Sequence, residues 1–278
     1  MKSYKFFVLG VGFAVLSIVL PVHAQGKTPK QSVPVTVFQA AGPNAASIQS
    51  TVDAFRAALG NPNGNAAGPL ASGRREINWD GGGGVDVTTA PVTPFNVFLN
   101  TRGGQFTTPG IGLSQAPASG GPQGGLAGLF NNATYGAEFA AFSPLRMFTP
   151  VGSNITEAIF FVPGSQGTLR ATVNGFGVIF TDVDQPDGSG PGRKHGNRGA
   201  STLVEFFDIN GGLLYSSFAP AAPGQKSLSF LAVKFADARI ASVRITTGDS
   251  APGPNDDDKH DIVMMDDFIY GEPQPLQP

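Results

Sequence analysis

The chain has 278 residues, a formal net charge of −2 and no cysteine. The lack of cysteine excludes disulfide bonds, thiol chemistry and zinc sites built on cysteine. The chain has no basic block of the kind that binds phosphate, so we do not expect nucleic acid as a partner. The 38 glycines and 23 prolines stay below the level of low-complexity chains, and 22 phenylalanines supply surface for burial. We therefore expect a turn-rich globular protein.

Residues 1–24 have the features of a cleavable secretory signal. Two early lysines form a positive start, an apolar run covers residues 6–19, and small residues precede the cleavage point. The alternative is a membrane anchor, but the run is shorter than the ~20 residues that a spanning helix needs, and Pro21 interrupts its end. We expect cleavage between Ala24 and Gln25, a periplasmic or extracellular protein, and no membrane anchor afterwards.

The remaining 254 residues have a length that suits one all-β domain. Removal of two lysines with the signal reduces the 18 basic residues to 16, against 20 acidic residues. All-β domains commonly reach about 200–250 residues as one unit. We expect a mobile lead-in at 25–42, a helix and a loop at 43–72, the β domain at 73–273 and a tail at 274–278.

One amphipathic helix is predicted near the start of this region. Asn44 or Ser47 can begin the helix, and Gly60 can end it. The apolar residues that recur with helical spacing are Ile48, Val52, Phe55 and Leu59. We interpret this stripe as a surface that packs against a sheet rather than one that binds a partner.

Short strands are predicted for the rest of the chain. Residues 85–106 read as one or two strands, and residues 107–128 as a surface loop or a crossover. Within 240–246 apolar and polar residues alternate, and Asn210-Gly211 carries the signal of a hairpin turn. The clearest candidate strands are 155–162, 169–173, 176–183, 202–208, 213–218, 228–235, 240–246 and 262–270. This pattern predicts an antiparallel β-sandwich of jelly-roll type with one short N-terminal helix.

Several segments carry a resemblance to a known group of proteins. They are Phe142-Ser143-Pro144-Leu145-Arg146-Met147-Phe148, Gly152-Ser153-Asn154-Ile155-Thr156, Phe160-Phe161-Val162-Pro163-Gly164, the run from Gly175 to Asp184, and Asp266-Asp267-Phe268-Ile269-Tyr270-Gly271-Glu272-Pro273. The chain from Gly73 onward resembles secreted bacterial proteins, some of which carry a PEP-CTERM sorting tail. The resemblance implies a jelly-roll, galactose-binding-like sandwich and no particular activity. Because residues 274–278 lack the apolar helix and basic end of such a tail, anchoring by that route is not expected.

Asp266 and Asp267 stand out because they lie inside a predicted strand between apolar residues. Neighbouring strand residues point to opposite faces, so one carboxylate must face the core or a rim pocket. There it needs a cation or hydrogen-bond donors. Jelly-roll carbohydrate-binding modules often place calcium between an early and a late strand, and this resemblance implies a structural calcium that joins Glu76 or Asp80 to Asp267. The candidate arginines for an ion pair with Asp267 instead of calcium are Arg74 and Arg75.

A second acidic segment contains Asp182, Asp184 and Asp187, followed by a glycine-rich turn. Oxygen ligands before a glycine turn are typical of calcium loops. The spacing does not fit an EF-hand, since the third carboxylate falls one position late and no glutamate follows at position 12. A solvated hairpin tip with internal ion pairs is the alternative. The acidic run 256–258 is interpreted as a solvated loop.

Carbohydrate binding would require aromatic side chains on one face or loop rim. The candidates are Trp79, Tyr135 and Tyr215, each of which could instead belong to the core. The glycine run 81–84 beside Trp79 is either a flexible turn or a place where the backbone approaches a ligand closely.

Catalysis has little support in the sequence. No zinc-binding His-Glu-x-x-His helix, Gly-x-Ser-x-Gly elbow or phosphate loop is present. A glycoside hydrolase needs only two carboxylates that flank a cleft, so it stays open as a lesser alternative. The candidate carboxylates, each of which could equally be a surface or structural acid, are Glu76, Asp80, Glu138, Glu157 and Glu205.

We therefore expect a secreted, non-catalytic β-sandwich that binds glycans or extracellular matrix and has a structural calcium site. A structural cell-surface or matrix protein without a small ligand is the main alternative. A glycoside hydrolase is the lesser one.

Overall fold

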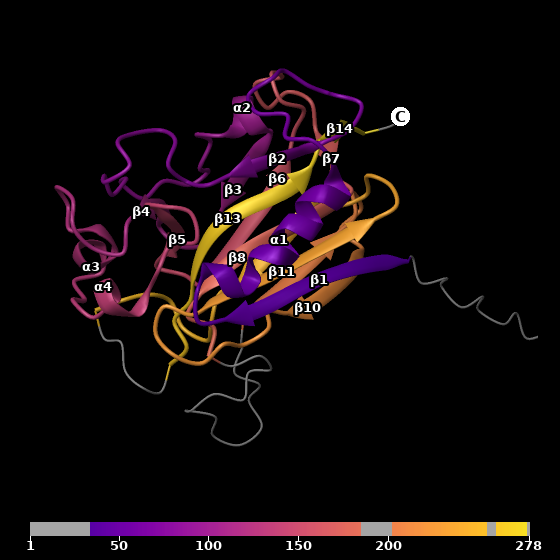
Figure 1. Ribbon diagram of the computed structural model, residues 1–278. Coiled ribbons are helices and arrows are strands. Elements are labelled where there is room, and N and C mark those ends of the chain that lie inside the picture. The colour runs from indigo at the N-terminus through magenta and orange to yellow at the C-terminus, as the bar shows by residue number, and fades with distance from the viewer. Residues whose placement is uncertain (1–33, 185–201, 255–259, 277–278) are drawn as a thin grey trace, which may run out of the picture. The chain divides into compact units, whose positions relative to one another are not determined.

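Two antiparallel sheets pack face to face in the computed structural model (Figure 1). The structure describes residues 34–184, 202–254 and 260–276. The larger sheet contains β1 (Val35–Gly42), β2 (Arg74–Ile77), β4 (Gly112–Ala116), β5 (Met147–Val151), β8 (Gly175–Thr181), β11 (Leu228–Phe235) and β13 (Met264–Gly271). The smaller sheet contains β3 (Gly104–Thr107), β6 (Ile155–Phe160), β9 (Leu203–Phe207), β10 (Leu213–Phe218) and β12 (Ser242–Thr246). The predicted all-β sandwich is confirmed.

The order of the larger sheet is β1-β11-β8-β13-β5-β4, with β2 also paired to β13. The order of the smaller sheet is β10-β9-β12-β6-β3. Two short strands, β7 (Ala171–Thr172) and β14 (Gln274–Pro275), pair with each other. The helices are α1 (Ala45–Leu59), α2 (Leu99–Arg102), α3 (Gly125–Leu129) and α4 (Tyr135–Glu138). None of the helices in the described part of the chain is long and apolar enough to cross a membrane.

The core between the two sheets is dominated by aromatic rings. Trp79 stacks on Phe148 with ring centroids 3.7 Å apart, and Phe268 meets the Trp79 ring edge-on at 4.8 Å. Phe106 of the smaller sheet lies 5.3 Å from Trp79, so the cluster joins both sheets. Aromatic pairs in these arrangements add to the stabilisation that burial alone provides.

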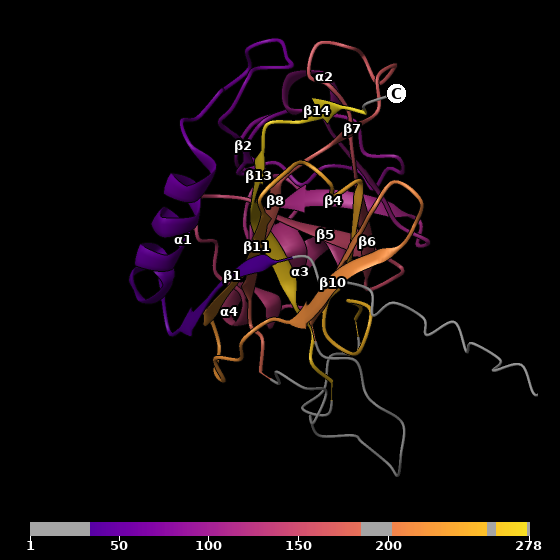
Figure 2. The same ribbon diagram turned by 90° about the vertical axis from the view of Figure 1, so that its right-hand side faces the viewer.

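Helix α1 covers the outer face of the larger sheet (Figure 2). The Asn44 side chain accepts a hydrogen bond from the Ser47 amide at 3.3 Å and caps the helix. Gly60 ends it with a φ of 104°, which glycine adopts without steric cost. The predicted stripe of Ile48, Val52, Phe55 and Leu59 is buried against β8, β11 and β13. Both the boundaries and the buried face of this helix are as predicted.

The smaller sheet, in contrast, keeps its outer face open to solvent. Val243 and Ile245 of β12 are fully buried, whereas Arg244 between them is exposed. The same alternation runs along β6 and β9. This half-buried pattern is typical of an antiparallel sheet with one solvated face.

Several elements differ from the sequence-based expectations. The expected mobile lead-in contains β1, which pairs along its whole length with β11. The expected loop at 107–128 contains β4 and part of α3, and β2 and β5 were not predicted. Residues 274–275 of the expected tail form β14. The secretory signal and the expected cleavage site lie outside the described residues.

Candidate functional site

A β-bulge places the carboxyl groups of Asp266 and Asp267 together. The register between β13 and β8 shifts between Met265 and Phe268, at the point where β13 leaves β5 and begins to pair with β2. The Ser143 hydroxyl donates to Asp267 and lies 3.5 Å from Asp266 Oδ1. The expectation that the two side chains point to opposite faces is therefore wrong, because a bulge interrupts strict alternation.

Arg56 of helix α1 is the cationic partner of this acidic group. Its Nη2 atom lies 2.9 Å from Glu76 Oε2 and 3.4 Å from Asp267 Oδ2. Arg74 donates to the other oxygen of Glu76 at 2.5 Å. Neither arginine expected to pair with Asp267 does so. Arg74 pairs with Glu76, and Arg75 forms a separate buried pair with Glu272. A helix distant in the sequence supplies the positive charge instead.

The structure brings together only two of the three residues expected to bind calcium. Glu76 and Asp267 converge on the Arg56 guanidinium, whereas Asp80 accepts hydrogen bonds from the amides of Leu145 and Arg146, both at 3.0 Å. No group of three or more acidic, histidine or cysteine side chains in the described ranges is arranged to hold a metal. Calcium binding at this place stays a prediction. In the structure, the Arg56 guanidinium lies between the carboxylates of Glu76 and Asp267.

The second acidic segment lies at the end of β8. Asp184 accepts a hydrogen bond from the Gly224 amide at 3.0 Å, and its own amide lies 3.4 Å from Asp261 Oδ1. Asp182 has a positive φ of 69° at the turn out of the strand. Asp187 lies outside the described residues, so the expected set of three ligands is not tested.

Burial raises the pKa of Asp266 well above its usual value, and the neighbouring charge of Asp267 raises it further. The amides of Phe142 and Ser143 partly oppose this increase. Burial also raises the pKa of Asp267, while Ser143 and Arg56 oppose it. Asp266 is fully buried and Asp267 is 3% exposed, so no substrate reaches the pair. We interpret it as a structural element of the sheet.

The three aromatic residues expected to contact sugars do not form a surface. Trp79 and Tyr135 are fully buried. Trp79 donates from Nε1 to the Asp266 carbonyl at 3.0 Å, which satisfies its polar atom inside the core. Tyr215 is half-buried and packs near Phe206, with ring centroids 6.4 Å apart. The core interpretation therefore holds for Trp79 and Tyr135, and ligand binding by them is excluded by burial.

The glycine run 81–84 wraps around side chains of the protein itself. The buried Arg146 guanidinium donates to the carbonyls of Asp80 at 2.6 Å and Gly81 at 3.0 Å. Gln115 also donates to the Gly81 carbonyl, at 2.7 Å. A Cβ atom at Gly81 would lie 2.8 Å from the Phe98 ring. Because these glycines have no side chains, Arg146, Gln115 and Phe98 can pack closely against their backbone.

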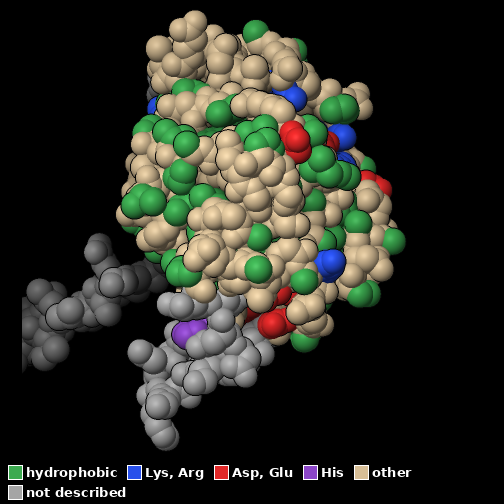
Figure 3. All heavy atoms as spheres, turned by 90° about the vertical axis from the view of Figure 1, so that its left-hand side faces the viewer, with side chains coloured by type: hydrophobic (Ala, Val, Ile, Leu, Met, Phe, Trp, Pro, Cys, Tyr) green, Lys and Arg blue, Asp and Glu red, His purple; other side chains and the backbone are tan. Residues whose placement is uncertain are grey.

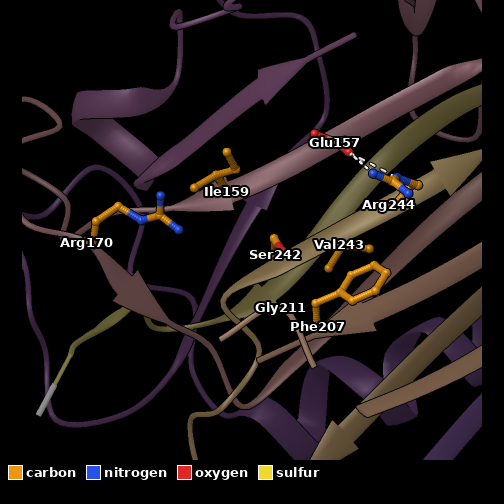
Figure 4. Close-up of a pocket in the computed structure, with 8 residues that line it drawn as sticks. All are labelled: Glu157, Ile159, Arg170, Phe207, Gly211, Ser242, Val243 and Arg244. Carbon is orange, nitrogen blue, oxygen red and sulfur yellow. Dashed lines mark hydrogen bonds and ion pairs between the residues drawn. The ribbon is translucent and has the colours of Figure 1, made fainter. Parts of the chain in front are cut away.

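An open hollow of about 300 Å³ lies on the outer face of the smaller sheet (Figure 4). Arg170 lies at one end of the hollow and the Glu157–Arg244 pair at the other, with Ser242 and Ile159 between them. The lining residues are Glu157, Ile159, Arg170, Phe207, Gly211, Ser242, Val243 and Arg244. The hollow combines an aromatic ring, a hydroxyl group and charged side chains.

Strand register determines the arrangement of the charged groups in the hollow. Arg244 on β12 lies directly opposite Glu157 on β6 and Glu205 on β9. Its Nε and Nη2 atoms both donate to Glu157 Oε1, at 3.0 and 2.6 Å. The guanidinium carbon of Arg244 also lies 6.0 Å from the centre of the Phe207 ring. These cross-strand contacts hold the side chains in a defined geometry.

Two of the carboxylates considered for a glycoside hydrolase, Glu157 and Glu205, lie on this open face. Their strands are separated by β12, so the two backbones are roughly 10 Å apart at the usual strand spacing. Arg244 lies between them and pairs with Glu157. Of the other three, Glu76 and Asp80 have the partners described above, and Glu138 belongs to α4. The Arg244 guanidinium therefore lies between the two carboxylates, where a glycoside hydrolase would need a cleft for the sugar.

A second hollow of about 630 Å³ is lined by Asp208 and Ile209 of the turn between β9 and β10, by Thr172, and by residues 237–239 and 274–276. Its charged side chains already form hydrogen bonds or an ion pair with other groups of the protein. Asp208 accepts hydrogen bonds from the amides of Asn210 and Gly212, both at 2.8 Å, and Asp237 pairs with Arg239 at 2.5 Å. The first hollow is therefore the better candidate for a binding site.

No family model, curated protein or solved structure matches the chain. The assignment of function therefore rests on the site itself. Of the residues that line the hollow, Glu157 is a site candidate predicted from the sequence, whereas Arg170, Phe207 and Arg244 are not. The alternation in 240–246 did place Ser242 and Arg244 on the solvent side, and this was the only signal in the sequence that pointed to this face.

Proposed function

We propose that this protein is a secreted, non-catalytic β-sandwich that binds glycans in the hollow of its five-stranded sheet. The observation that carries the proposal is the open hollow itself, lined by an aromatic ring, a hydroxyl group and charged side chains. Binding sites for small ligands are concave and combine apolar surface with a few placed polar groups.

The lining residues match the chemistry of a sugar ring. The ring of Phe207 offers an apolar surface to the C–H face of a sugar. Glu157 and Ser242 offer acceptors for sugar hydroxyl groups, and Arg244 offers donors. The hydrogen bonds between Glu157 and Arg244 hold these two side chains before the ligand arrives, which lowers the entropy cost of binding.

Affinity electrophoresis of the chain from Gln25 onward tests the proposal. The gels would contain soluble xylan, galactomannan, mixed-linkage glucan, polygalacturonate or alginate. We expect retardation by at least one polysaccharide, without release of reducing ends. Reducing ends released by wild type and lost in Glu157→Gln would instead favour a glycoside hydrolase.

A matched pair of variants locates the binding site. Phe207→Ala removes the ring in the hollow, and we expect at least a tenfold loss of affinity. Phe218→Ala removes a 42% exposed ring from β10 of the same sheet, outside the hollow, and should leave affinity unchanged. Equal effects of the two variants, or no binding by wild type, would contradict the proposal.

A structural matrix protein is the second candidate, and a nearly uncharged surface favours it. Residues 103–137 contain no charged side chain. The face that carries β4, α3 and α4 accordingly shows few charged groups (Figure 3). Ile111, which directly precedes β4, is 71% exposed. Exposed apolar surface of this kind can mediate association. Sedimentation velocity tests this alternative, which requires assembly that increases with concentration and is lost in Ile111→Lys.

A further inference from the structure

We infer that the hollow selects acidic glycans, with Arg170 as the residue that binds the sugar carboxylate. This inference rests on the proposed function and specifies its ligand class. The ligand is a polysaccharide of uronic acids, in which each ring carries one planar carboxylate among its hydroxyl groups.

Arg170 differs from the other arginine in the hollow because it has no ion-pair partner among the described residues. It is exposed at the start of the short β7–β14 segment, and its guanidinium points into the hollow (Figure 4). The guanidinium carbon lies 5.3 Å from the centre of the Phe161 ring. An aromatic face of this kind positions a guanidinium without using its N–H donors. The donors of Arg170 thus remain directed at the hollow.

Arg244 fills a different role at the opposite end. Two of its nitrogen atoms already donate to Glu157, and the pair is half-exposed. An acidic ligand that paired with Arg244 would have to displace Glu157. Hydroxyl groups of the sugar, in contrast, can bond to the Glu157–Arg244 pair without separating it. The hollow therefore has one end for a carboxylate and another for neutral polar groups.

The local charge also favours an anionic ligand. Two arginines and one glutamate line the hollow, which gives a net charge of +1, whereas the whole chain carries −2. A guanidinium presents parallel N–H groups that match the two oxygens of a carboxylate, and such bidentate contacts are stronger than neutral hydrogen bonds. A lysine in the same place would supply charge without this geometry.

Isothermal titration with polygalacturonate, neutral xylan and dextran sulfate tests the inference in 150 mM NaCl. We expect wild type to bind polygalacturonate at least tenfold more tightly than xylan. Arg170→Gln should remove this preference and leave the affinity for xylan within twofold. Arg170→Lys should keep the positive charge but lose most of the preference for polygalacturonate over dextran sulfate.

Arg239→Gln is the matched control. Arg239 also lies over a phenylalanine ring, 5.6 Å from the centre of Phe235, but it is outside the hollow and pairs with Asp237. We expect it to bind all three polymers as wild type does. Thermal melts of each variant confirm that the fold is kept.

The outcomes separate the inference from the proposed function. Equal affinity for xylan and polygalacturonate, or a preference that survives in Arg170→Gln, would overturn the selection of acidic glycans while glycan binding stands. Equally tight binding of dextran sulfate would also overturn it, because charge alone would then explain the affinity. No binding to any polysaccharide of either panel would refute glycan binding itself.

Discussion

Asp266 and Asp267 hold their carboxyl groups side by side, although they are neighbours in a strand. The bulge in β13 brings both within reach of the Ser143 hydroxyl, and Arg56 balances only Asp267 directly. Two buried carboxylates with one nearby cation share a proton more readily than they carry two negative charges. The proton is expected to reside on Asp266, whose pKa burial raises the more strongly.

Asp266→Asn tests this shared proton. A pKa that is higher in the folded state than in the unfolded state gives stability that is complete below about pH 4, the ordinary range of a carboxyl group, and is lost as the pH rises through the folded-state value. Asparagine keeps an acceptor for the Phe142 and Ser143 amides and supplies a permanent donor for Asp267. We expect this variant to be at least as stable as wild type at pH 7.5, with a smaller decline in stability between pH 4 and 8 in urea unfolding.

Asp267→Asn serves as the matched control for that experiment. It removes the negative charge that faces Arg56, and both side chains are mostly buried. Because Arg56 keeps Glu76 as a partner, we expect a loss of about 1–3 kcal/mol in the free energy of unfolding at pH 7.5. Equal destabilisation by the two asparagine variants would show that Asp266 is ionised in the folded protein.

The buried pair of Arg75 and Glu272 predicts a large effect of single substitutions. The two side chains are 0% and 1% exposed and make two hydrogen bonds, of 2.5 and 2.6 Å. Arg75→Met would leave Glu272 buried without its partner, which we expect to cost about 3–5 kcal/mol. The double variant with Glu272→Met should recover part of that loss. A single variant within 1 kcal/mol of wild type in urea unfolding would contradict this view of the pair.

Calcium can be tested directly by calorimetry. The sequence predicts calcium at this place, whereas the structure supplies another cation, the Arg56 guanidinium, between Glu76 and Asp267. From the structure we expect the same Tm with 2 mM CaCl₂ and with a chelator. In Arg56→Gln the two carboxylates lose this cation, and we expect calcium to raise the Tm of that variant. A calcium-dependent increase in Tm of the wild type would instead support a bound metal.

Elements with strong local patterns could be predicted from the sequence. Helix α1 was predicted because its apolar stripe, its capping Asn44 and its terminal Gly60 agree with one another. The strands from β6 to β13 have β-branched and aromatic residues with clear turns between them. Strand β4 was missed because Gly112–Ala116 has low intrinsic strand preference, and pairing with β5 stabilises it. Strand β1 was missed although Val35-Thr36-Val37-Phe38 favours a strand, because the polar, proline-containing residues before it are typical of a mobile lead-in.

The candidate site was mostly beyond prediction for a different reason. Arg170, Phe207 and Arg244 line the same hollow only because of the order of the strands, which the sequence does not reveal. The contact of Arg56 with Asp267 joins residues that are 211 positions apart. The bulge at Asp266 leaves no signal in the apolar pattern of the sequence. The assumption that neighbouring strand residues alternate strictly therefore predicts the wrong orientation for the Asp266 and Asp267 side chains.

Amide chemical-shift mapping by NMR tests the central claim, that the open face of the five-stranded sheet binds glycans. Xylohexaose and trigalacturonate would be titrated in parallel into the labelled protein. We predict that at least one of them shifts amides of 157–159, 207–211 and 242–244 while those of α1 stay unchanged. Shifts confined to the face of β4, α3 and α4, or no shift with either sugar, would contradict the claim.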